Sequence, residues 1–83
     1  MLELPVGYYL IGGAFEEYEH AEDYSDELFP KGYHDVIVGY SSARGYYYTV
    51  LSRHASLNEA NAEKARVRRR QGMSDVWVLN VEN

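Results

Sequence analysis

The chain of 83 residues contains no cysteine, which excludes a disulfide framework and any metal site built on thiolates. It has only eight Lys and Arg residues against 13 Asp and Glu, for a net charge of -5. A general nucleic-acid-binding protein needs a net basic surface, so we expect no nucleic-acid partner. No apolar run approaches the roughly 20 residues of a membrane-spanning helix. We therefore expect no direct membrane insertion by this fragment.

Aromatic side chains are what the sequence has in excess, because aromatic residues make up 14% of it and nine residues are Tyr. A chain of this length forms one small domain, near the size at which a single hydrophobic core is only just sufficient. We predict that the domain spans residues 7–81. Residues 1–6 and 82–83 are then flanking tails of a domain excised from a longer protein.

The two halves of the chain resemble each other. Gly32–Val38 and Gly72–Val78 share four of seven residues, and an offset one residue shorter pairs Tyr9 with Tyr48. Each half shows the pattern strand, helix, glycine turn, strand. The similarity predicts a duplicated unit, and thereby an architecture for the whole chain.

The expected elements follow from apolar periodicity and from the turn residues between them. Strands are predicted over residues 8–11, 35–40, 46–51 and 75–81, and helices over 16–31 and 57–71. Gly12-Gly13 is expected to end the first strand, and Ser56 to cap the second helix together with Glu59. The order βαββαβ predicts an α+β, ferredoxin-like (RNP-like) plait, a four-stranded antiparallel sheet with both helices on one face. Right-handed crossovers place the first and third strands in its centre.

Two helices cover only one side of such a sheet, so its strands should alternate apolar and polar residues. These strands are apolar on both sides. We assign Leu10, Val36, Val38, Val50, Val76 and Val78 to the helix side. The opposite side receives Tyr9, Ile11, Ile37, Tyr47, Thr49, Leu51, Trp77 and Leu79. An exposed face of this kind generally marks a binding surface, here an aromatic platform for sugar rings or bases. The alternative is plain burial, by a dimer partner or by a segment that lies outside this sequence.

Charged residues gather in two runs. Seven acids between Glu16 and Glu27 form the solvated face of the first helix, and Lys64–Arg70 forms a basic run at the end of the second. We expect the two runs to pair across the helices. The alternative for the basic run is a contact with an anionic polymer, a phosphate or a partner protein. Glu16 and His20 share a helix face, but no further ligands accompany them, so no metal is expected.

Nothing in the sequence indicates an enzyme. The three histidines lack the spacing of metal ligands, and no serine has a recognisable base with an orienting group around it. Gly12-Gly13 lacks the third glycine of a dinucleotide fingerprint. We therefore predict no catalytic residue and no cofactor.

Five short motifs, in their order and spacing, resemble the SPOR domain, a bacterial module of about this length. They are Tyr8–Phe15 for the opening strand, Gly32-Tyr33 for the turn after the first helix, Tyr48–Val50 for the third strand, Glu59-Ala60 for the second helix, and Asp75–Val78 for the closing strand. The resemblance covers nearly the whole chain.

This resemblance implies a non-catalytic domain that binds peptidoglycan, specifically glycan strands stripped of their stem peptides at division septa. It implies a place in the periplasm or cell envelope, as part of a longer bacterial protein, and binding through the open sheet face. Trp77 would stack on sugar rings. Together with the residues assigned to the open side, the expected glycan-binding set is Tyr9, Ile11, Ala14, Tyr47, Thr49, Leu51, Trp77 and Leu79.

Two departures from the family pattern concern this set. Ile11 and Ala14 stand where many members have Gln and Ser, and Arg53-His54 replaces a glycine and an aromatic residue after the third strand. The expected site is thus more apolar than usual. A homodimer through the same face is the rival interpretation. An RNA-binding plait is a third, and it is disfavoured by the acidic charge.

Overall fold

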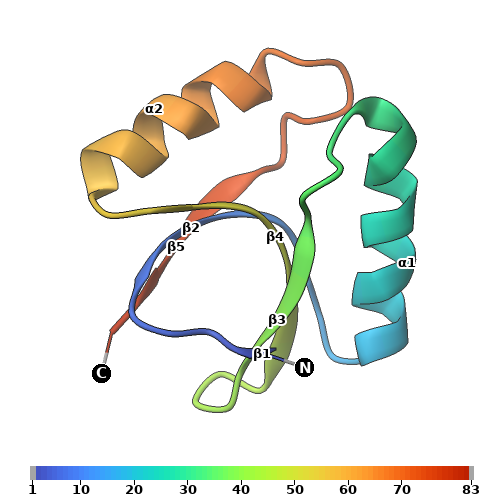
Figure 1. The fold of residues 1–83 in the computed structure, drawn as a ribbon, viewed down its shortest axis with the longest axis vertical. Coiled ribbons are helices and arrows are strands. Elements are labelled where there is room, and N and C mark those ends of the chain that lie inside the picture. Colours follow the sequence, from blue (N-terminus) through green and yellow to red (C-terminus); the bar gives the residue numbers. More distant parts are fainter. Residues whose placement is uncertain (1, 83) are drawn as a thin grey trace.

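The computed structural model describes residues 2–82 and confirms the α+β plait (Figure 1). Its strands are β1 (Leu2–Glu3), β2 (Gly7–Phe15), β3 (Ile37–Ser41), β4 (Tyr46–His54) and β5 (Trp77–Val81). Its helices are α1 (Tyr18–Leu28), the short 3₁₀ helix η1 (Phe29–Lys31) and α2 (Leu57–Arg68). From β2 onward the order is βαββαβ, as the sequence predicts.

The sheet has the strand order β1-β3-β4-β2-β5. The four strands β3, β4, β2 and β5 are antiparallel, and β2 and β4 occupy the centre as predicted. The short strand β1 is an addition, pairing in parallel with the outer edge of β3. Both helices pack on the same side, α1 against β2, β3 and β4, and α2 against β2, β4 and β5.

The central strands are longer than predicted, because Gly12-Gly13 does not end the first strand. The β2–β4 register shifts twice, between Leu10 and Ile11 and between Ile11 and Gly13. The shifts leave Leu51 of β4 and Gly12 of β2 as extra residues, the signature of β-bulges. A side chain on Gly12 would meet Leu51 and other helix-side residues within 4 Å. Glycine is needed there because the helix layer approaches the backbone closely.

A left-handed glycine follows each helical segment, as the sequence indicates. Gly32 after η1 and Gly72 after α2 have φ values of 99° and 79°, the left-handed conformation that glycine adopts most readily. The second helix begins at Ser56, whose hydroxyl accepts the backbone N–H of Glu59 at 3.2 Å, as predicted. The first helix ends earlier than expected, because Pro30 forces the chain into η1.

The helix side of the sheet holds the main core. Its fully or nearly fully buried members are Leu10, Leu28, Val67, Met73 and Val76, with Tyr24, Tyr33, Val36, Leu51 and Val78 packed around them. Within residues 2–82 the backbones of the two helices do not approach each other closely. Each helix therefore depends on the sheet for its burial.

Candidate binding face

The helix-free side of the sheet, here called the open side, carries a second buried cluster rather than a bare platform. Its members come from the N-terminal segment and from three strands: Leu4, Tyr9, Ile11, Tyr48, Val50, Leu79 and Val81, with Trp77 packed against them. The cluster exists because both faces of β2, β4 and β5 are apolar.

Three residues of the predicted site lie on the helix side instead. Thr49 is fully buried, and its hydroxyl donates to the carbonyl of Ala21 in α1 at 3.0 Å. The ring of Tyr47 contacts that of Tyr18 in α1, with centroids 5.9 Å apart. Leu51 packs against the helix-side core. The predicted placement of Tyr47, Thr49 and Leu51 on the open side is therefore wrong, and so is that of Val50 on the helix side.

The sequence did hold a signal for the correct phase of β4. Pairing Tyr9 with Tyr48 places Val50 at the position of Ile11, and all four side chains lie in the open-side cluster. Alternation alone could not reveal this, because β4 is apolar on both faces. The bulge at Leu51 further shifts the alternation toward the end of the strand.

An N-terminal strap, residues 2–6, crosses the open side from β3 to the start of β2 (Figure 1). Leu4 is only 4% exposed, and its backbone N–H donates to the carbonyl of Tyr40 at 2.9 Å. A Cβ on Gly39 would come within 2.3 Å of the Leu4 side chain. The hydroxyl of Tyr9 donates to the carbonyl of Pro5 at 2.5 Å. The strap is thus seated on the sheet by packing and by hydrogen bonds.

Residues 2–6, predicted from the sequence to be a flanking tail, pack on the sheet, and the domain bounds of 7–81 stay a prediction. Residue 1 lies outside the described residues. At the other end Glu82 follows β5 and is exposed, and residue 83 also lies outside the described range.

The strap also settles how the apolar centre of the open side is covered. Tyr9, Ile11 and Leu79 have exposed fractions of 2%, 0% and 4%. These three residues, expected in the glycan-binding set, are therefore buried. The cover of this centre is the chain's own N-terminal segment, predicted from the sequence to be a tail.

An aromatic row lies on the open side; its middle member, Tyr48, is buried (2% exposed), and its two outer members are accessible. The row consists of Tyr46, Tyr48 and Trp77, with Ala14 beside Tyr48 on the neighbouring strand. Trp77 is partly exposed and meets Tyr48 edge to face, with ring centroids 6.0 Å apart and planes at 70°. Ala14 and Tyr46 are exposed. Of the predicted set, Trp77 and Ala14 are thus accessible in and beside this row.

Two hollows lie beyond the strap, at the other end of β4. One, of about 300 Å³, is lined by Pro5, Tyr9, Asp35, Ile37, Val50, Leu51, Ser52 and Arg53. The other, of about 330 Å³, is lined by Val6, Gly7, Tyr8, Arg53, His54 and Ala55. Arg53 belongs to both. The sequence prediction did not include this residue, although Arg53-His54 stood out as a departure from the family pattern.

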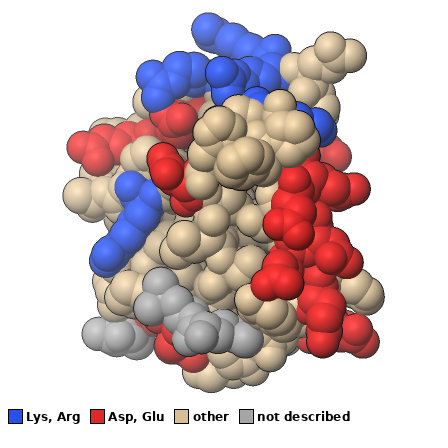
Figure 2. All heavy atoms as spheres, turned by 45° about the vertical axis from the view of Figure 1, so that its right-hand side comes forward, with Lys and Arg blue, Asp and Glu red and all other residues tan. Residues whose placement is uncertain are grey.

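Charged side chains are segregated on the surface, with basic residues at the end of α2 and acidic residues along α1 (Figure 2). The predicted pairing across the helices is wrong, since no ion pair within residues 2–82 joins them. Arg66 pairs instead with Glu63 on its own helix. Arg68 donates to the carbonyl of Val76, and Arg70 lies over the ring of Tyr33. The physical reason is that the helices stand apart on the sheet.

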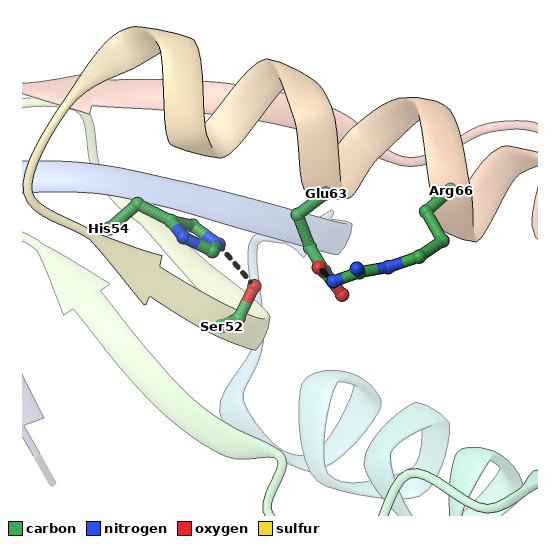
Figure 3. A network of polar contacts seen from close by, with 4 residues as sticks. All are labelled: Ser52, His54, Glu63 and Arg66. Carbon is green, nitrogen blue, oxygen red and sulfur yellow. Dashed lines mark hydrogen bonds and ion pairs between the residues drawn. The ribbon is translucent and has the colours of Figure 1, made fainter.

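Ser52 and His54 form the one serine–histidine contact in the described part of the chain, with the hydroxyl 2.8 Å from the ring Nε2 (Figure 3). A nucleophilic serine needs a base that is in turn oriented by a third group. Neither ion pair among residues 2–82 involves His54, and the Glu63 drawn in the same view is engaged with Arg66. The pair therefore has the geometry of a hydrogen bond that anchors the end of β4, without the parts of a catalytic triad.

Residues 2–82 contain no group of three or more His, Cys, Asp or Glu side chains arranged to hold a metal ion. No helix in this range has the length and apolar character needed to cross a membrane.

Burial on the open side also raises the pKa values of two tyrosines. Loss of hydration raises the pKa of Tyr9 above its ordinary 10.0, while the nearby Arg53 opposes that rise. Burial likewise raises the pKa of Tyr48, with Arg44 opposing. Both phenols are therefore neutral at physiological pH and can donate hydrogen bonds.

A plait with its helices on one side, an aromatic row on the other, and two hollows at the end of β4 defines a small binding module. The family model described as SPOR domain matches residues 4–80. The chain therefore belongs to the SPOR domain family, whose members are non-catalytic modules that bind peptidoglycan. No curated protein and no solved structure gives a significant match.

Proposed function

We propose that this SPOR domain docks glycan strands stripped of their stem peptides on the open side of its sheet. In this way it targets a parent protein to the cell wall at the division septum, in the periplasm. Family membership over residues 4–80 supports peptidoglycan as the ligand. The aromatic row supports the location, and Trp77 is the residue on which the proposal chiefly depends.

Trp77 suits a sugar ring for physical reasons. Its indole offers a large flat apolar face with one hydrogen-bond donor at the edge. The T-shaped contact with Tyr48 holds the ring in place, so little side-chain entropy is lost on binding. Ala14 lies next to Tyr48 on β2 and leaves room beside it. A sugar strand could run along this row without displacing the strap.

The test is co-sedimentation with sacculi pretreated with an amidase. We expect Trp77→Ala to weaken binding by about tenfold or more, as for the central aromatic residue of an interface. Trp77→Phe should retain part of the affinity. Phe29→Ala is the matched control, because Phe29 is an exposed aromatic residue (57%) in η1, away from the sheet. Unaltered binding by a folded Trp77→Ala variant would remove the aromatic row from the proposal.

Homodimerisation through the same face is the alternative function. The strap already covers the centre of that face, so a second copy is not needed to bury it. We expect a monomer in light scattering at micromolar concentration. A dimer that Trp77→Ala dissociates would favour the alternative instead.

A further inference from the structure

Removal of a stem peptide changes the charge of a glycan strand. Amidase adds water across the amide that joins the lactyl carboxyl group of muramic acid to the peptide. The amine leaves with the peptide, and the carboxylate stays on the sugar. A stripped strand thus carries one carboxylate per muramic acid, where a peptide-bearing strand has a neutral amide. A domain that prefers stripped strands gains from a well-placed cation.

Arg53 is a cation held in position on the open side. Its guanidinium lies 5.8 Å from the centre of the Tyr9 ring, and one Nη donates to the carbonyl of Val6 at 2.7 Å. It also lies against Gly7, where an added Cβ would approach the Arg53 Nε to 3.0 Å. The side chain is exposed. Three contacts orient the group. Within residues 2–82 its side chain has one hydrogen-bond acceptor, the Val6 carbonyl, and no ion pair, so further N–H donors are available to a ligand.

The surroundings of Arg53 suit a strand that passes over it. The two hollows of about 300 and 330 Å³ meet at this residue, so sugar rings could lie on either side of the guanidinium. The first hollow includes the exposed apolar side chain of Ile37, and the second includes Gly7 and Ala55. One carboxylate, Asp35, borders the first hollow, where it can accept hydrogen bonds from sugar hydroxyls.

Arg44, the other arginine near the open side, lacks these properties. It borders a hollow that also contains the carboxylates of Glu3 and Glu82. One of its Nη atoms donates to the carbonyl of Asn80 at 3.3 Å. An anionic ligand would meet two like charges there. The comparison singles out Arg53 and supplies a matched control.

We propose that Arg53 binds the lactyl carboxylate of stripped muramic acid and thereby sets the preference of the domain for stripped glycan. This inference rests on the proposed function. It extends the ligand surface from the aromatic row, across the strap, to the end of β4. It also gives the strap a role, because the carbonyl of Val6 orients the guanidinium.

The test compares two forms of one ligand. Glycan oligosaccharides from amidase-digested sacculi are used either with free carboxylates or with the carboxylates converted to methylamides. We expect the wild-type domain to bind the free form about tenfold to a hundredfold more tightly, as for a charge-assisted hydrogen bond. Arg53→Gln should lose that preference and bind both forms like the wild type binds the methylamide. Arg44→Gln should keep it, and Arg53→Lys should keep part of it.

The outcomes separate the two proposals. If the wild type binds neither oligosaccharide nor sacculi, the proposed function itself fails. If the wild type binds both forms equally, the carboxylate plays no part and the inference on Arg53 is overturned, while the proposed function stands. The comparison of the two ligand forms uses only the wild type, so its result stands even if Arg53→Gln proves unstable. A preference that persists in a folded Arg53→Gln variant would also overturn the inference.

Discussion

At the residue scale, the glycine at position 39 is explained by Leu4, a residue far from it in the sequence. Gly39 lies within β3, where glycine is ordinarily unfavourable, and the side chain of Leu4 occupies the space above it. Leu4 is buried among the open-side cluster. The two residues are thus complementary in shape.

We expect Gly39→Ala to destabilise the domain by about 1–3 kcal/mol, because the added methyl group overlaps the side chain of Leu4. Leu4→Ala alone should cost about 2–5 kcal/mol through the loss of buried contacts. In the double variant the costs should not add, since the smaller residue 4 leaves room for the methyl group. Urea denaturation of the four proteins measures this coupling. Simple additivity would show that Leu4 does not rest on Gly39 in solution.

At the scale of elements, the strap and the bulges determine which residues are accessible on the open side. The bulges at Gly12 and Leu51 change which residues face the helices. The strap then buries the centre of the open side and leaves the aromatic row and the two hollows at its borders. The candidate site therefore consists of the residues that the strap leaves uncovered.

A protein that begins at Gly7 should be less stable than the full chain by about 3 kcal/mol or more. It loses the burial of Leu4 and the hydrogen bonds to the carbonyls of Pro5 and Val6. A protein that begins at Leu4 is the matched control, and it should lose less, because only the β1 pairing and the contact of Glu3 with the backbone N–H of Ser42 disappear. Thermal and urea unfolding compare the three. Equal stability of the full chain and the Gly7 version would contradict a strap that packs on the sheet.

At the scale of the whole molecule, tyrosines are buried or partly buried on both sides of the sheet, with Tyr9 and Tyr48 on the open side and Tyr24 on the helix side. Burial raises the pKa of Tyr9 and Tyr48 on the open side and of Tyr24 on the helix side. A small domain has no spare core to compensate if these side chains take up charge. Its stability should therefore depend on pH in the alkaline range.

We expect the free energy of unfolding to be insensitive to these phenols below pH 10, where they are protonated in both states. Above pH 10.0, the ordinary tyrosine pKa, the unfolded chain loses phenol protons more readily than the folded one. The folded state then binds more protons, so stability falls as pH rises further through the raised pKa values. Denaturant unfolding at several alkaline pH values measures the slope. Tyr48→Phe should make it shallower, and an unchanged slope would exclude Tyr48 as a contributor.

The sequence by itself determined the order of elements, the central place of β2 and β4, the helix ends at Gly32 and Gly72, and the side of the sheet on which Trp77 lies. Those features follow from local signals: periodicity, capping residues, glycine turns and the handedness of crossovers. The family resemblance drew on the same local motifs.

Only the tertiary structure decided which apolar residues are accessible. Leu4 buries Tyr9 and Ile11 through contacts between distant parts of the chain, and composition gives no sign of such contacts. The side of the sheet that Thr49 faces depends on the strand register. The sequence could not reveal it, because β4 is apolar on both faces and shows no alternation of apolar and polar residues. The position of Arg53 over Tyr9 likewise needs two strands and the strap together. Local chemistry specifies the elements, whereas exposure is a property of how they pack.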